Sequence, residues 1–143
     1  MMNESNIKNR TKLIKILDMI GYEDAVIRRD GAWDLSIFYT SREEKLIVIE
    51  MCASERVNGD MIVDPLMRIE LLLDTDGNIT EVHPVFYQSQ TIMGEVELYA
   101  KDNTDCWNPD LIEKPGQLDD KLSNWLDSIE VQGYLTAGIV EKI

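Results

Sequence analysis

The spacing of the apolar residues changes twice along the chain, and this change constrains the fold more than any other feature. Near the start, apolar residues recur every three or four positions, which is typical of an amphipathic helix: Leu13, Ile16, Leu17 and Ile20. From residue 25 to residue 100 they mostly alternate with polar residues, as in strands, and helical spacing returns near residue 117. This order predicts an α+β fold: an antiparallel sheet flanked by an N-terminal and a C-terminal helix.

The two helices are expected over residues 7–20 and 117–132. Gly21 and Gly133 follow them directly, where the left-handed residue that ends many helices favours glycine. The apolar stripe of the second helix comprises Leu118, Leu122, Trp125, Leu126 and Ile129. This stripe predicts that Trp125 belongs to the core.

Between the helices the alternation predicts about five or six strands. Asp30-Gly31 suits a tight hairpin between the first two strands, and Asp76-Gly77 suits a turn between the fourth and the fifth. The segment 45–53 is apolar on both faces, which predicts a central strand covered on each side. The expected strands are Ala25–Arg28, Ala32–Thr40, Lys45–Ala53, Met67–Asp74, Ile79–Val85 and Glu95–Ala100.

Polar residues and prolines predict where strands are interrupted. Residues 54–64 turn polar around Asn58-Gly59-Asp60 and precede Pro65, so this segment is expected to be a loop. Pro84 lacks an amide hydrogen and is therefore expected at the end of its strand or on an edge of the sheet. No linker or repeat divides the chain, so residues 1–143 are expected to form a single domain.

The residues also indicate a compartment. Cys52 and Cys106 lie far apart and outside any Cys-x-x-Cys pair, which favours reduced thiols over a disulfide framework or a zinc site. No uninterrupted apolar stretch is long enough for a signal peptide or a membrane span. A cytoplasmic protein without a membrane association is expected.

Charge narrows the classes of partner. The formal net charge of −13 disfavours direct binding to DNA or RNA, because nucleic-acid affinity depends on cations that neutralise phosphates. Residues 95–130 contain ten acidic residues and only three lysines, so a basic protein is the expected partner. The candidate surface comprises Glu95, Glu97, Asp102, Asp105, Asp110, Asp119 and Asp120. A basic face on the first helix is the alternative docking surface: Lys8, Arg10, Lys12 and Lys15.

Motifs for chemistry are sparse. Asp74-Thr75-Asp76-Gly77-Asn78 begins like a calcium loop, but the sixth and twelfth positions, which should be Gly and Glu, are Ile79 and Val85. The scattered glycines form no phosphate-binding motif, so no cofactor is expected. His83 is the single histidine and has no recognisable nucleophile motif beside it.

Two segments carry a resemblance to a known family. The run Asp64-Pro65-Leu66-Met67-Arg68-Ile69-Glu70-Leu71 followed by Glu81-Val82, and the closing Asn108-Pro109-Asp110, Leu118-Asp119-Asp120-Lys121-Leu122 and Trp125-Leu126, resemble the YqiB-like family of small bacterial proteins. The family's tyrosine-histidine-aspartate is replaced here by Leu72-Leu73-Asp74. Asn58-Gly59-Asp60 with Asp64-Pro65 also resembles a domain of conjugative-element and phage proteins. Neither resemblance implies an activity or catalytic residues.

These observations favour one function and leave a second open. The first is a non-enzymatic acidic protein-binding module of a bacterium or its mobile elements. The alternative is a metal-dependent hydrolase that uses clustered carboxylates and His83.

Overall fold

The computed structural model of the chain describes residues 4–90, 96–100 and 116–143. The elements in chain order are α1 (Glu4–Met19), β1 (Ala25–Arg28), β2 (Asp34–Arg42), β3 (Leu46–Val57), β4 (Asp60–Leu73), β5 (Ile79–Gln90), β6 (Val96–Ala100), α2 (Gln117–Val131), α3 (Tyr134–Ala137) and β7 (Ile139–Lys142). No helix within these ranges is long and apolar enough to cross a membrane.

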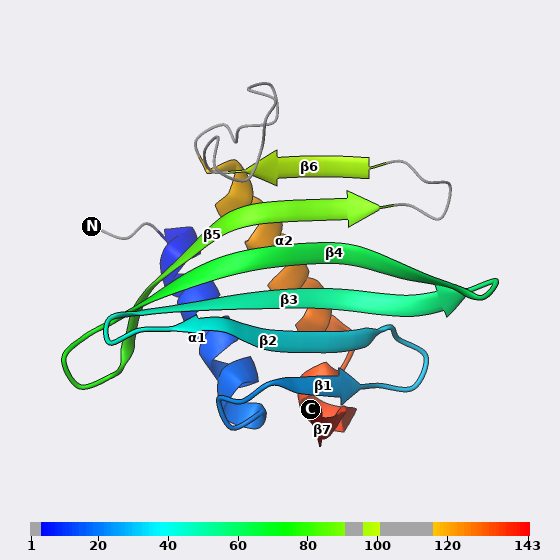
Figure 1. The fold of residues 1–143 in the computed structure, drawn as a ribbon, viewed down its shortest axis with the longest axis horizontal. Coiled ribbons are helices and arrows are strands. Elements are labelled where there is room, and N and C mark those ends of the chain that lie inside the picture. Colours follow the sequence, from blue (N-terminus) through cyan, green and yellow to red (C-terminus); the bar gives the residue numbers. More distant parts are fainter. Residues whose placement is uncertain (1–3, 91–95, 101–115) are drawn as a thin grey trace.

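The strands form one antiparallel sheet in the order β6-β5-β4-β3-β2-β1-β7 (Figure 1). Six of them follow one another between α1 and α2, so the expected α+β architecture is confirmed. The seventh, β7, follows the short helix α3 and pairs with β1 at the edge of the sheet. β7 was not predicted from the sequence, because four residues are too few to establish a period.

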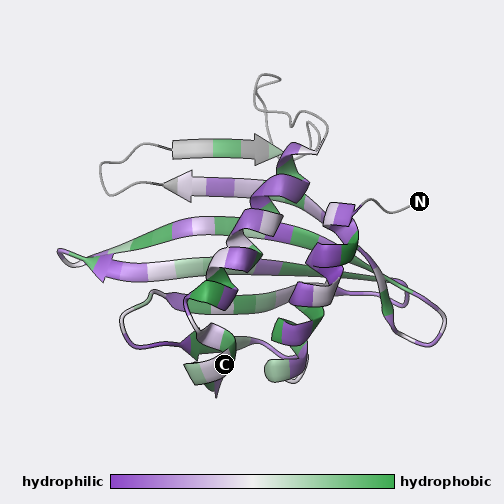
Figure 2. Ribbon diagram, turned by 180° about the vertical axis from the view of Figure 1, so that it is seen from behind, coloured by the Kyte–Doolittle hydropathy of each residue, from purple (hydrophilic) through white to green (hydrophobic). Residues whose placement is uncertain are grey.

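Both long helices pack on the same face of the sheet. Figure 1 shows them behind the strands, and the reverse view in Figure 2 shows them in front, with hydrophobic and hydrophilic residues alternating along their length. The buried side chains of the two helices meet those of the central strands in one continuous cluster, which includes Leu13, Leu17, Ile37, Ile49, Met51, Ile69, Leu122 and Ile129. The domain is therefore a two-layer structure with its core between one sheet face and the helices.

The expectation that β3 is covered on both faces is wrong. Ile49 and Met51 are buried on the helix side, whereas Val48, Glu50 and Cys52 on the other side are only partly buried. No described helix covers that second face (Figure 1). Within the described part of one chain, the apolar residues on both sides of β3 thus do not mark a layer on each side.

The loop expected over residues 54–64 is a β-hairpin instead. β3 and β4 continue past the rest of the sheet and are joined by Asn58-Gly59, both of which have positive φ angles of 52° and 86°. Two successive left-handed residues define the tight turn that matches the twist of paired strands. The polar residues of this segment lie at the exposed end of a hairpin. The Asn-Gly pair indicated this hairpin turn more strongly than the polar composition indicated a loop.

The two prolines of the sheet lie inside strands, where the pairing is irregular. Pro65 is absent from the register between β3 and β4, which shifts between Cys52 and Ser54. Pro84 pairs with Ile69 of β4 beside a register shift and lies within β5, not at its end. The described pairing of β5 with β6 begins at Phe86, so at Pro84 the described residues give β5 a neighbouring strand on one side only. A bulge removes the need for one ladder hydrogen bond, which accommodates a residue without an amide hydrogen.

We predict that Leu122→Ala lowers the free energy of unfolding by about 2–5 kcal/mol, because Leu122 is completely buried and the truncation leaves a cavity in the core. Val131→Ala on the same helix is the matched control, since Val131 is 87% exposed, and it should change stability by less than about 0.5 kcal/mol. Urea unfolding followed by circular dichroism measures both. Equal stability losses in the two variants would contradict the packing of α2.

Candidate binding site

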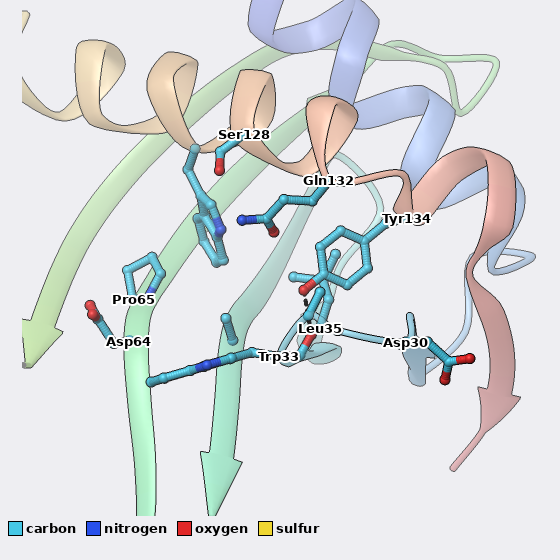
Figure 3. Close-up of a pocket in the computed structure, with 12 residues that line it drawn as sticks. Asp30, Trp33, Leu35, Asp64, Pro65, Ser128, Gln132 and Tyr134 are labelled. Carbon is cyan, nitrogen blue, oxygen red and sulfur yellow. Dashed lines mark hydrogen bonds between the residues drawn. The ribbon is translucent and has the colours of Figure 1, made fainter. Parts of the chain in front are cut away.

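A cavity of about 600 Å³ opens between the C-terminal half of α2 and the sheet. Its walls come from α2, α3, the turn that leads into β2, and strands β2, β3 and β4 (Figure 3). The twelve lining residues are Asp30, Gly31, Ala32, Trp33, Leu35, Ala53, Asp64, Pro65, Trp125, Ser128, Gln132 and Tyr134. Its volume is in the range typical of pockets that bind small ligands or single anchoring side chains.

Local backbone features place the aromatic residues at this cavity. Trp33 directly precedes β2, after a turn in which Gly31 adopts a positive φ of 79°. Gly133 ends α2 with a φ of 83°, and the chain then reverses so that Tyr134 points back toward the sheet. The Tyr134 hydroxyl donates a hydrogen bond to the Trp33 backbone carbonyl, which ties α3 to the start of β2 (Figure 3).

Trp125 occupies the border between core and cavity. Leu118, Leu122, Leu126 and Ile129 form the buried stripe of α2, whereas Trp125 is partly buried, packs against the core and lines the cavity. The sequence expectation that Trp125 belongs to the core therefore describes one of its faces only. Trp33 is partly buried as well.

The polar groups of the cavity favour a cationic ligand. Asp30 and Asp64 are the charged residues among the twelve described lining residues, and none of the twelve is Lys, Arg or His. Ser89 donates a hydrogen bond of 2.5 Å to one oxygen of Asp64. Burial raises the pKa of Tyr134, with the Asp34 carboxylate acting in the same direction, so its hydroxyl remains a donor at neutral pH. Arg29 packs against Gly133 nearby without lining the cavity.

The structure brings together few of the acidic residues expected to form a binding surface. Glu95, Asp102, Asp105 and Asp110 lie outside the described residues, and of Glu97 the structure describes the backbone position in β6. Asp119 and Asp120 lie in the first turn of α2, about 8–9 Å along the helix axis from Trp125, the nearest cavity residue of that helix, and neither lines the cavity. The acidic end of α2 and the aromatic cavity are therefore separate places on the domain.

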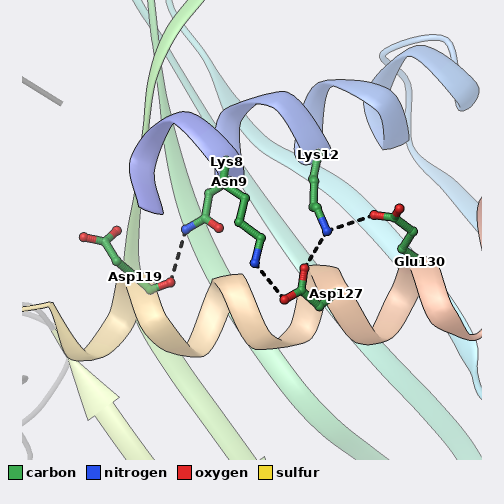
Figure 4. Close-up of polar contacts among 6 residues, drawn as sticks. All are labelled: Lys8, Asn9, Lys12, Asp119, Asp127 and Glu130. Carbon is green, nitrogen blue, oxygen red and sulfur yellow. Dashed lines mark hydrogen bonds and ion pairs between the residues drawn. The ribbon is translucent and has the colours of Figure 1, made fainter. Parts of the chain in front are cut away.

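Other acidic residues of α2 contact the basic face of α1. Lys12 approaches Asp127 at 2.5 Å and Glu130 at 2.9 Å, while Lys8 approaches Asp127 at 2.7 Å (Figure 4). Asn9 donates a hydrogen bond to the Asp119 carbonyl at 3.1 Å. Part of the acid excess of this half is thus paired within the domain, and so is part of the basic face.

The residues considered for catalysis do not converge within the described ranges. His83 lies on β5 opposite Glu70, on the face away from the helices, with its Nε2 at 3.8 Å from Glu81. Burial raises the pKa of the Cys52 thiol, which makes it a poor nucleophile at neutral pH. No three His, Cys, Asp or Glu side chains among the described residues are placed to share a metal ion. The hydrolase hypothesis finds no site in this part of the chain.

The segment that begins like a calcium loop is the β4–β5 turn, as the sequence analysis expected. One carboxylate oxygen of Asp74 accepts hydrogen bonds from the backbone amides of Asp76 and Asn78, both at 2.9 Å. These bonds lower the pKa of Asp74 and hold the turn closed around Gly77, whose φ is 84°.

Comparison of the chain with protein-family models, with curated proteins and with solved structures finds no match. The cavity residues lie outside the acidic surface that the sequence analysis proposed. They come from four separate segments, and the only local signals were the Asp-Gly turn before Trp33 and the tryptophan at the margin of the α2 stripe.

We predict that Asp127→Asn destabilises the domain at neutral pH and that this difference disappears on acidification. Lys12, then Lys8, lower the pKa of Asp127 in the folded state below its ordinary value of 3.8. A carboxylate with a depressed pKa stabilises the folded state above its unfolded pKa, and the stabilisation is lost as the pH falls through the folded pKa. Melting temperatures of parent and variant from neutral to acidic pH measure the difference.

Glu44→Gln is the control for this experiment, because Glu44 is exposed in the β2–β3 turn. It should leave the melting temperature unchanged at every pH. High salt should also reduce the effect of Asp127→Asn, since the paired groups are partly exposed and screened. An effect of Asp127→Asn that persists at low pH would show that packing, and not charge pairing, joins these helix faces.

Proposed function

We propose that the chain is a non-enzymatic protein-binding module whose aromatic cavity receives a basic side chain of a partner protein. The observation that carries this proposal is the composition of the cavity: three large aromatic residues and the Asp64 carboxylate, with no cationic residue among the described lining residues. Aromatic rings and a carboxylate together favour a ligand that combines apolar surface with a positive charge, as lysine and arginine side chains do.

The energetics of protein interfaces support a single anchoring pocket. Tryptophan and tyrosine are enriched among the few interface residues that contribute most to affinity, and such residues line pockets filled by the partner. Trp33 and Trp125 are partly buried in the free domain, so each has little rotamer freedom to lose when a ligand packs on it. A partner side chain would thus meet a largely preformed site.

The overall charge supports the same class of partner. A net charge of −13 attracts cationic proteins at long range and repels nucleic acids. In this proposal Asp119, Asp120 and the acidic residues of 95–110 act by steering the partner, while the cavity supplies the contact. The cytoplasmic location and the setting in a bacterium or its mobile elements belong to the proposal, and they rest on the cysteine pattern and the family resemblance.

The proposal predicts that a short fluorescein-labelled peptide in which lysine and arginine alternate with leucine binds the domain, and that Trp33→Ala weakens binding. The loss should reach about thirtyfold, the equivalent of about 2 kcal/mol for an anchoring residue. Fluorescence anisotropy measures the dissociation constant, and a thermal melt verifies that the variant is folded. A peptide with glutamate in place of lysine and arginine should not bind.

Two further variants distinguish binding in the cavity from a general attraction to the acidic domain. Tyr22→Ala removes an aromatic residue that is 39% exposed away from the cavity and should leave affinity unchanged. Asp119→Asn combined with Asp120→Asn should slow association and weaken binding less than Trp33→Ala does, since exposed charges act mainly through steering. Binding that ignores Trp33 but requires Asp119 and Asp120 would place the partner on the acidic helix end instead.

A further inference from the structure

The sheet face opposite the helices carries more apolar residues than a solvated face needs. By the pairing register and the alternation of side chains, the apolar residues that point to this side include Val26, Phe38, Val48, Leu66, Leu72 and Phe86. All six are partly exposed. Antiparallel sheets with one free face ordinarily present polar residues there. The composition of this face therefore favours contact with another protein surface.

The central row of this face identifies the partner. Phe38, Glu50, Arg68 and Phe86 lie directly opposite one another across β2, β3, β4 and β5. Glu50 and Arg68 form an ion pair at 3.3 Å, and the Arg68 guanidinium lies 5.4 Å from the centre of the Phe86 ring. From β2 to β5 the order of side chains is aromatic, acidic, basic, aromatic. Reversing this order exchanges the two charges and leaves the aromatic ends the same.

A row of this kind is complementary to itself. We infer that the open face binds a second copy of the chain, related by a two-fold axis that runs parallel to the strands between β3 and β4. This rotation places β3 over the partner's β4 and β2 over the partner's β5, at the spacing of about 10 Å between packed sheets. Each Glu50 then faces the second copy's Arg68, and each Phe38 faces its Phe86, as an isologous interface requires.

The neighbouring row on one side agrees with this axis. Ser36, Cys52, Leu66 and Gln88 form the next row across the same strands. The rotation sets Cys52 against Leu66 and Ser36 against Gln88 of the second copy, which pairs apolar with apolar and polar with polar. On the other side of the central row, Val48 faces Glu70 of the second copy, an apolar against a charged side chain. Beyond that row, Leu46 and Leu72 lie opposite each other on β3 and β4 and meet in the same manner as Cys52 and Leu66. The aromatic cavity lies on the helix side and remains accessible in the dimer.

Salt should change the affinity of the dimer and the affinity for a basic partner in opposite directions. Two copies of net charge −13 repel each other at long range, and salt screens that repulsion beyond about 8 Å at physiological ionic strength. Dimerisation through a largely apolar face should therefore strengthen as salt rises. Binding of a cationic peptide should weaken, so the two proposals fail or hold independently.

Charge reversal tests the dimer by sedimentation velocity over a range of protein concentrations. Glu50→Arg alone and Arg68→Glu alone each place like charges opposite each other at the two symmetric positions, so each variant should sediment as a monomer. Mixing the two variants should restore a dimer, because the arginines of one chain then face the glutamates of the other. Glu44→Arg, the same reversal at the exposed β2–β3 turn, should dimerise like the parent.

The doubly substituted chain with Glu50→Arg and Arg68→Glu retains an internal ion pair and should dimerise, which guards against loss of folding in the single variants. Circular dichroism verifies the fold of each chain. A parent that remains monomeric at its highest soluble concentration in high salt would overturn the inference. A dimer that persists in both single variants would do the same, since it would use another surface.

Discussion

The apolar contact between one face of the sheet and the two helices is the constraint on which the rest of the structure depends. The buried stripe of α2 from Leu118 to Ile129 fixes the rotation of this helix about its axis. That rotation leaves Trp125 and Ser128 at the margin of the core, above the β2 and β4 residues that complete the cavity. The same one-sided burial leaves the opposite sheet face open to a partner. Both proposed binding surfaces are thus consequences of a two-layer architecture.

The acidic residues of this domain are of two kinds, those paired within the domain and those exposed to solvent, and the composition does not distinguish them. Asp127 and Glu130 contribute to the acidic count of the C-terminal half, yet both contact Lys12 and neutralise the facing side of α1. Asp120, on the same helix, is exposed in the first turn, where a carboxylate also stabilises the helix dipole. A count of acids along the sequence therefore overstates the field that a partner meets, because pairing between distant elements is invisible in it.

Local patterns predicted the layers of this fold well, because spacing in the sequence reports directly on a buried face. The stripes of α1 and α2 and the alternation along β2 and β4 suffice for the α+β architecture. Longer-range features were missed for a physical reason: the bulges that accommodate Pro65 and Pro84 depend on register, and β7 depends on an edge supplied by β1. The cavity was missed likewise, since Trp33, Ala53, Pro65 and Tyr134 become neighbours only when four segments meet.

The pairing of β7 with β1 matters during synthesis, because β1 is made long before the strand that pairs with it. Arg28 and Glu141 contact each other although 113 positions separate them in the chain. While the ribosome is still producing α2, one edge of β1 therefore has no strand beside it. An exposed strand edge is a template for pairing with other chains. β7 is the strand that closes this edge, so a nascent chain in which β1 is complete and β7 is not yet made exposes the edge to wrong pairing.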